Sequence, residues 1–153
     1  MAISAKLDDI IEGMEFQSDE TTSYLHKKTG KVVTITAEGF RAAEDDEPIE
    51  DFPDWQHKNI RTAKKILEIN DYLALPSKFD IHEYAIMERF CLSISDDRTR
   101  EIMYRSIKGR GAFRRFKDNI HRYDIAEDWY GYRDQAIRQI AIDWCEVNEI
   151  VFS

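Results

Sequence analysis

Apolar residues recur every three or four positions through the second half of the chain, and this spacing constrains the fold more than any other feature. It places the apolar side chains on one face of a helix. Asp80 and either Ser95 or Asp96 are suitable helix caps, and Gly109 can end a helix. We therefore expect a helical bundle in residues 80–148. Its four helices would run from 81 to about 94, from 97 to about 108, onward from Gly111 and Ala112, and from 125 to about 148.

The first half of the chain contains the pattern of a β-hairpin. Residues 24–28 and the β-branched run 31–36 flank Gly30, which can adopt the positive φ angle that a short hairpin turn requires. A lone hairpin is only marginally stable in water. The short apolar run Tyr72–Leu75 is therefore predicted as a third strand beside it.

The remaining segments complete an α+β fold. Apolar spacing predicts a first helix capped by Ser4 and another helix from Pro53 to about Asn70. Residues 44–54 hold seven acids and two prolines, which is typical of an exposed, mobile connection. At 153 residues the chain suits a single domain, 1–153. The predicted fold class is α+β, a small antiparallel sheet (hairpin plus one strand) packed beside a mainly helical C-terminal bundle.

The composition excludes several classes of protein. Cys91 and Cys145 are far apart, which excludes a disulfide scaffold and a zinc site made of cysteines alone. No apolar run approaches the roughly 18 residues of a membrane helix, and the N-terminus lacks a secretory signal pattern. We expect a cytoplasmic protein that does not engage membranes. Serines, cysteines and the four histidines show no spacing typical of a catalytic triad or a metal site, so no catalytic residue, cofactor or metal is predicted.

Positive charge is concentrated in residues 98–122, which hold nine basic and two acidic residues in a chain of net charge −8. Several of these bases follow the i, i+4, i+7, i+11 spacing of one helix face. Arginine matches the paired oxygens of phosphates and carboxylates, so this face would suit a nucleic acid or an acidic protein. Tyr130 joins the set because it falls outside the apolar stripe of the last helix. The candidate binding residues are Arg110, Arg114, Arg115, Lys117, His121 and Tyr130.

A second interpretation of the same segment is structural. The basic side chains would pair with nearby acids such as Asp124, Glu127, Asp128 and Asp134, and no free cationic surface would remain. Phe113 and Phe116 are three residues apart, so both are expected in the core after a tight turn between helices.

The run GRGAFRRFKD at 109–118, together with residues 128–133 and 136–146, resembles an uncharacterised bacterial protein family, number 158 in the series of uncharacterised protein families. The hairpin and residues 71–76 also resemble its pattern. The similarity covers roughly residues 20–148. It implies a bacterial or phage cytoplasmic protein. Because the family has no established activity, cofactor or catalytic residue, the resemblance assigns no functional residue.

Three functions remain open from the sequence. The first is a non-enzymatic interaction or regulatory module that presents the basic helical face to a nucleic acid or an acidic protein. The second is a hydrolytic enzyme with a cleft between the sheet and the bundle, which would require a pocket with a clustered His or Cys and a perturbed carboxylate. The third is a structural oligomer. The sequence does not indicate an oligomeric state.

Overall fold

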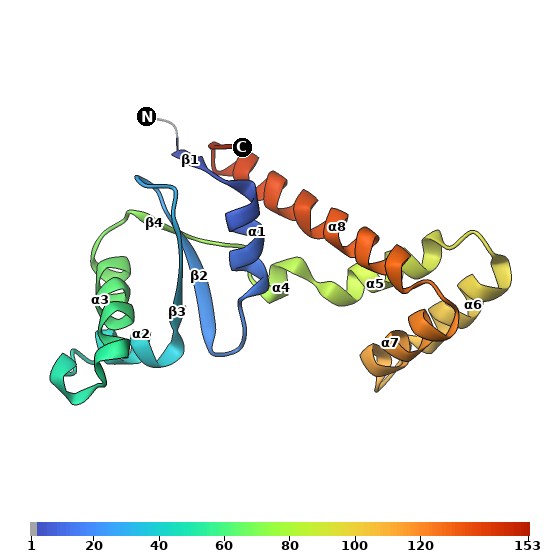
Figure 1. Ribbon diagram of the computed structural model, residues 1–153, viewed down its shortest axis with the longest axis horizontal. Helices are drawn as coiled ribbons and strands as arrows, with labels where there is room; N and C mark the ends of the chain where they lie inside the picture. The colour runs from blue at the N-terminus through green and yellow to red at the C-terminus, as the bar shows by residue number, and fades with distance from the viewer. Residues whose placement is uncertain (1–2) are drawn as a thin grey trace. The chain divides into compact units, whose positions relative to one another are not determined.

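The computed structural model describes residues 3–153, and the chain forms two compact units. The first unit contains the chain up to Asp80 together with Ile140–Ser153, and the second contains Ile81–Gln139. The C-terminal boundary falls within one long helix, α8 (Ala126–Val147) (Figure 1). That helix therefore supplies core residues to both units: Ile137 is buried in the second, and Ala141 and Cys145 are buried in the first.

A three-stranded antiparallel sheet in the order β3-β2-β4 is the centre of the first unit. β2 (Thr21–His26) and β3 (Val32–Thr36) form the predicted hairpin, and β4 (Tyr72–Ala74) pairs with the other side of β2. The predicted third strand is thus confirmed. The turn requires glycine at position 30, because its φ angle is +72° and an added Cβ would lie 2.0 Å from the backbone oxygen of Ser4.

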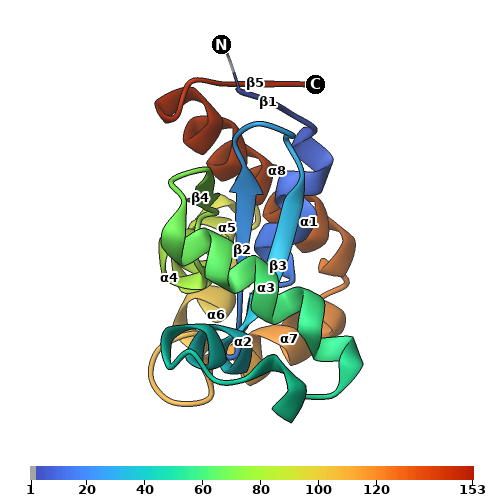
Figure 2. The ribbon, with the colours of Figure 1, turned by 90° about the vertical axis from the view of Figure 1, so that its left-hand side faces the viewer.

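Helices cover both faces of this sheet. α1 (Leu7–Glu15) packs on one face, where an added Cβ at Gly13 would meet Val32 at 2.6 Å. Alternation along the strands turns Ile35 to the other face, which α2 (Ala37–Glu44) and α3 (Asp54–Glu68) cover (Figure 2). On that face the rings of Tyr24 and Phe40 meet edge to face, with centroids 5.6 Å apart. The core of this unit therefore lies in two layers, one on each side of the sheet.

The two ends of the described chain pair as strands, which was not predicted. β1 (Ile3–Ala5) lies parallel to β5 (Ile150–Phe152), with Ile3 opposite Ile150. The prediction that Ser4 caps the first helix is therefore wrong. α1 begins only at Leu7, because residues 3–5 are extended and hydrogen-bonded to the chain end.

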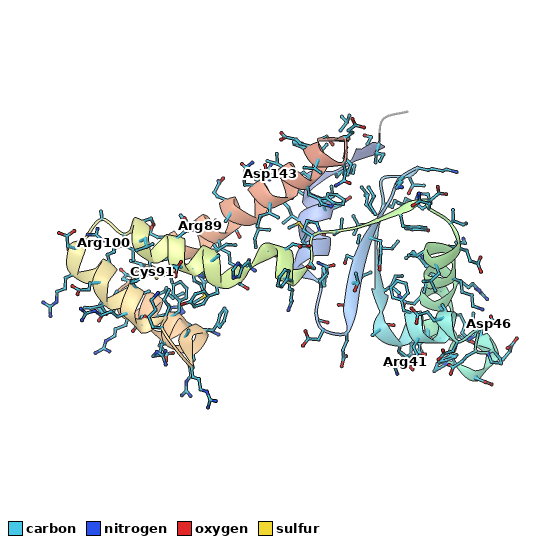
Figure 3. The ribbon with its side chains drawn as sticks, turned by 180° about the vertical axis from the view of Figure 1, so that it is seen from behind. Arg41, Asp46, Arg89, Cys91, Arg100 and Asp143 are labelled. Carbon is cyan, nitrogen blue, oxygen red and sulfur yellow. The ribbon has the colours of Figure 1, made fainter. Side chains whose placement is uncertain are left out.

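The acidic segment 44–54 contains more regular structure than expected. It includes the last residue of α2, a left-handed turn at Asp46 and a short 3₁₀ helix, η1 (Ile49–Asp51). α2 was not predicted. Thr36 caps it: its side chain accepts a hydrogen bond of 2.9 Å from the backbone N–H of Gly39. Figure 3 labels Arg41 and Asp46 near the end of this helix. The mobility of the segment stays a prediction.

The second unit is helical. The short helix α4 (Lys78–Ile81) precedes it, and α5 (Glu83–Ser93), α6 (Asp97–Ser106) and α7 (Ala112–Arg122) lead to α8. The prediction that Asp80 caps a helix from residue 81 is wrong: Asp80 lies within α4, and α5 begins only at Glu83 because His82 has a positive φ angle of 51°. Asp96 caps α6 as predicted, accepting hydrogen bonds from the backbone and hydroxyl of Thr99.

Aromatic rings form the core of the second unit. Phe90 from α5 contacts Phe116 from α7, and Trp129 and Tyr132 from α8, with ring centroids 5.3–6.1 Å apart. Cys91, the residue after Phe90, is also fully buried (Figure 3 labels Cys91). Each of these edge contacts adds about 0.5–1.5 kcal/mol to the burial of the rings. The chain is an α+β protein with a small antiparallel sheet and a helical part, as predicted.

Candidate interaction surface on helix α7

The turn between α6 and α7 sets the orientation of the basic residues. Gly109 and Gly111 have left-handed φ angles of +81° and +75°, and α7 begins directly after them. Ala112, Phe116 and Ile120 are buried. The opposite side of the helix faces solvent and carries Arg114, Lys117 and His121. Arg110 was predicted on the same helix face but lies in the turn before the helix, because the left-handed Gly111 precedes the first helical residue. Arg110, Arg114, Lys117 and His121 are all exposed, and we call these four residues the α7 face.

Arg115 has a different position from its neighbour Arg114. Its guanidinium donates hydrogen bonds of 2.7 Å to the backbone oxygens of Ser106 and Lys108, and another to the backbone oxygen of Arg110. All three guanidinium nitrogens are engaged, so this side chain closes the turn between α6 and α7. Sequence reasoning did not separate Arg115 from the candidate binding residues, because its partners are backbone atoms that no side-chain pattern reveals.

Elsewhere in the basic segment, three cations are paired, whereas Arg98 and Arg122 form no ion pair within residues 3–153. The guanidinium of Arg100, labelled in Figure 3, forms an ion pair of 2.5 Å with Asp97 and donates a hydrogen bond to the backbone oxygen of Ile94. Arg105 forms an ion pair of 2.6 Å with Glu101. Lys108 lies 3.5 Å from a carboxylate oxygen of Glu88. Its ammonium also lies 3.9 Å from the ring centre of Tyr104. Pairing within the chain therefore accounts for Arg100, Arg105 and Lys108, although their partners are Asp97, Glu101 and Glu88 and not the acids expected from the sequence.

The α7 face is not neutralised in this way. Within residues 3–153, Arg110, Arg114 and Lys117 form no ion pair. In the same described residues, no ion pair joins these cations to the acids that the sequence offered as partners, which are Asp124, Glu127, Asp128 and Asp134. One acid, Asp118, is exposed on the same helix, four residues after Arg114, without forming an ion pair with it in the described chain. The cations of the face are therefore in contact with solvent.

The position of Arg114 in the first turn of α7 is also unfavourable for the stability of the helix. The N-terminal end of a helix carries a partial positive charge, and cations there reduce helix stability. The first turn of α7 contains no acidic residue, and Gly111 supplies no side-chain cap. Arg115 compensates for its position through three hydrogen bonds, whereas nothing in the described chain does so for Arg114. Arg114 therefore contributes nothing evident to the fold.

Phe113 is exposed, which contradicts the prediction that it lies in the core with Phe116. The side chain of Phe113 is 56% exposed, whereas that of Phe116 is 3% exposed. The ring of Phe113 meets Tyr84 edge to face, with centroids 6.4 Å apart. The hydroxyl of Tyr84 donates a hydrogen bond of 2.8 Å to the backbone oxygen of Ile107. Each residue of a helix is rotated by about 100° from the one before it, so Phe113 lies about 60° around the helix from the buried Phe116. This rotation places the Phe113 ring at the border of the core.

Tyr130 is 49% exposed on α8, as its position outside the apolar stripe indicated. In residues 3–153, no hydrogen bond or ring contact joins Tyr130 to the α7 face. The structure thus brings together four of the six candidate residues, places Arg115 in the turn behind them, and leaves Tyr130 on another helix.

The alternative of a hydrolytic enzyme requires a pocket with a clustered His or Cys and a perturbed carboxylate. Burial raises the pKa of the Cys91 thiol to about 11 and also raises that of Cys145, so both thiols are poor nucleophiles. No group of three or more His, Cys, Asp and Glu side chains among residues 3–153 can hold a metal ion. A hollow of about 360 Å³ in the second unit is lined by Asp96 and Asp128, without His or Cys. Hydrogen bonds from Thr99 lower the pKa of Asp96, which is the direction opposite to that of a general acid.

Residues 3–153 contain no helix with the length and apolar character needed to cross a membrane.

Comparison with known proteins places the chain in a family. A family model described as an uncharacterised protein family, UPF0158, matches residues 2–153. A UPF0158 protein of Pseudomonas aeruginosa is 27% identical over 66 residues. This alignment spans 42% of the present chain and 43% of the relative, so the chain covers less than half of the relative's length. No solved structure matches the fold. Because the family match extends over nearly every residue, the chain belongs to the uncharacterised protein family UPF0158.

Proposed function

We propose that this protein is a non-enzymatic interaction module, and that its α7 face binds an anionic partner, either a nucleic acid or an acidic protein. The observation that carries the proposal is the state of Arg110, Arg114 and Lys117. All three cations are exposed and form no ion pair within residues 3–153; Arg114 and Lys117 lie on the solvent side of α7, and Arg110 lies in the turn before it. Phosphates and carboxylates are the groups that such side chains bind.

The distribution of charge between the two units supports this proposal. The second unit holds twelve basic and ten acidic residues, a net charge of +2. The rest of the chain holds ten basic and twenty acidic residues, a net charge of −10. An anionic partner is therefore repelled by most of the protein and attracted to the second unit, which restricts the surface it can approach.

Capture of partners from a bacterial lysate tests the proposal. The double variant Arg114→Glu, Lys117→Glu reverses two charges of the α7 face. A matched control is Lys58→Glu, Arg61→Glu on α3, where both side chains are exposed and, within residues 3–153, outside any ion pair. The two pairs have the same three-residue spacing and the same change of charge.

The proposal predicts that the α7 variant loses partners which the wild type and the α3 variant both retain. Nuclease treatment of the lysate then distinguishes a nucleic acid from an acidic protein. Equal recovery of every partner by both folded variants would contradict the proposal. The expected cytoplasmic location is part of the same proposal, because it would give the surface access to both classes of polyanion.

A further inference from the structure

We infer that the partner of the α7 face is a single-stranded nucleic acid, and that Phe113 is the platform on which one of its bases stacks. This inference rests on the proposed function and names the partner of that same surface. Arg110, Arg114 and Lys117 would bind the phosphates on either side of the stacked base. The observation that carries it is an exposed, laterally supported aromatic ring among unpaired cations.

Phe113 is a large aromatic side chain at the surface of the second unit. Its ring is 56% exposed, at the border between the buried and solvent sides of α7. Aromatic residues are enriched in the contact surfaces of proteins, and the cations near Phe113 in the sequence, Arg114 and Lys117, set it apart from the other exposed aromatic residues.

The Phe113 ring is also held in place. Tyr84 supports it edge to face at 6.4 Å, and the Tyr84 hydroxyl is fixed at 2.8 Å to the Ile107 backbone oxygen. An edge-to-face contact uses the rim of one of the two rings and leaves ring surface free. A ring that is already ordered loses little conformational freedom when a base stacks on it, so binding costs less entropy.

Helix geometry places two of the cations, Arg114 and Lys117, close to Phe113. Lys117 is four residues after Phe113, and side chains at this spacing are neighbours on a helix surface, with Cβ atoms about 5–6 Å apart. Arg114 is the next residue, and Arg110 projects from the turn that begins the helix. Gly109 leaves open space in that turn, because an added Cβ there would meet no atom within 4 Å. A flexible nucleic-acid backbone can therefore approach the α6–α7 connection and the first seven residues of α7.

This combination favours a single strand over the other polyanions. An acidic protein segment offers carboxylates to the cations but no flat π surface to the ring. In a duplex the base faces are stacked on one another and are unavailable. A single strand presents phosphates and free base faces in alternation, and stacking on an aromatic side chain contributes about 1–3 kcal/mol per base.

Fluorescence anisotropy with a labelled 12-nucleotide oligo-dT or oligo-U, and with a duplex of the same length, tests the inference on the full chain. The variant Phe113→Ala removes the platform, whereas Phe113→Trp retains an aromatic ring. Trp55→Ala is the matched control, because Trp55 is 77% exposed in the first unit. The charge variant Arg114→Gln, Lys117→Gln removes two phosphate contacts.

We expect single strands to bind more tightly than the duplex, and Phe113→Ala to weaken single-strand binding by about 5- to 150-fold. Phe113→Trp and Trp55→Ala should bind as tightly as the wild type. The slope of log K against log salt should be unchanged in Phe113→Ala and reduced by about 1.4 in the charge variant, because each phosphate contact to a single strand contributes about 0.7.

The possible failures are distinguishable. Equal affinity for single strand and duplex with no effect of Phe113→Ala would overturn the inference while the proposed function survives. No binding of either oligonucleotide, together with binding of poly-glutamate that the charge variant abolishes, would have the same meaning. If the charge variant binds every probe as the wild type does, or the wild type binds none, both the inference and the proposed function are wrong.

Discussion

Replacing Arg115 by glutamine should destabilise the protein, whereas the same change at Arg114 should not. Arg115 donates three hydrogen bonds to the backbone oxygens of Ser106, Lys108 and Arg110. Hydrogen bonds from charged donors are worth about 1.5–3 kcal/mol, and exposure of this side chain to water reduces each to about 1 kcal/mol. Ordering an arginine side chain costs about 1.5–2 kcal/mol. The net loss on substitution is therefore about 1–1.5 kcal/mol.

For Arg114→Gln the expected change in the free energy of unfolding lies within about 0.5 kcal/mol of zero. Its sign should favour the variant, because a cation leaves the positive end of α7. The two substitutions are chemically identical and one residue apart, so each serves as the control for the other.

Thermal unfolding followed by circular dichroism measures the difference. A change of 1 kcal/mol shifts Tm by about 2–4 °C in a protein of this size, so Arg115→Gln should melt about 2–6 °C below Arg114→Gln. If the two variants melt together, Arg115 does not hold the α6–α7 turn and its assignment to the fold is refuted. If Arg114→Gln melts lower, Arg114 has a structural role and its assignment to a binding surface is refuted.

Three further outcomes follow from other parts of the structure. Asn59→Ala should lose about 1–2 kcal/mol and self-associate at rising concentration in size-exclusion chromatography, since the Asn59 amide bonds to the exposed edge of β3; an unchanged Tm and elution volume would contradict this. Gly30→Ala should destabilise the fold by about 3 kcal/mol or more because of the Ser4 oxygen, whereas Gly109→Ala, in open space, should lose about 1 kcal/mol; equal losses in denaturant titrations would be inconsistent with the turn geometry. The Cys91 pKa of about 11 predicts slow reaction with a thiol reagent in the native protein, and a stability that falls as pH rises from about 9 towards 11, since the unfolded thiol ionises first; rapid native labelling would argue against burial.

Much of the fold follows from local pattern. The hairpin around Gly30, the strand beginning at Tyr72 and the helices of the second unit were predicted because apolar periodicity, turn residues and caps agree there. The β1–β5 pair was not predictable in this way, because it joins Ile3 to Ile150, and neither segment carries a signal of the other. Long-range pairing overrode the local helical pattern that follows Ser4.

The candidate site divides in the same manner. Helical spacing correctly placed Arg114, Lys117 and His121 on one exposed face, because three- and four-residue steps determine the faces of any amphipathic helix. The same spacing put Phe113 in the core, although the burial of its helix is centred on Phe116 and the stripe is too narrow to include both. The role of Arg115 depends on three carbonyls brought together by the turn, which only the structure shows.

Partner capture by the charge-reversed α7 variant, measured against the matched α3 variant in the same lysate, tests the central claim most directly. The account predicts that Arg114→Glu, Lys117→Glu remains folded by circular dichroism and loses a polyanionic partner that Lys58→Glu, Arg61→Glu retains. Retention of that partner by both folded variants would contradict the assignment of function to the α7 face.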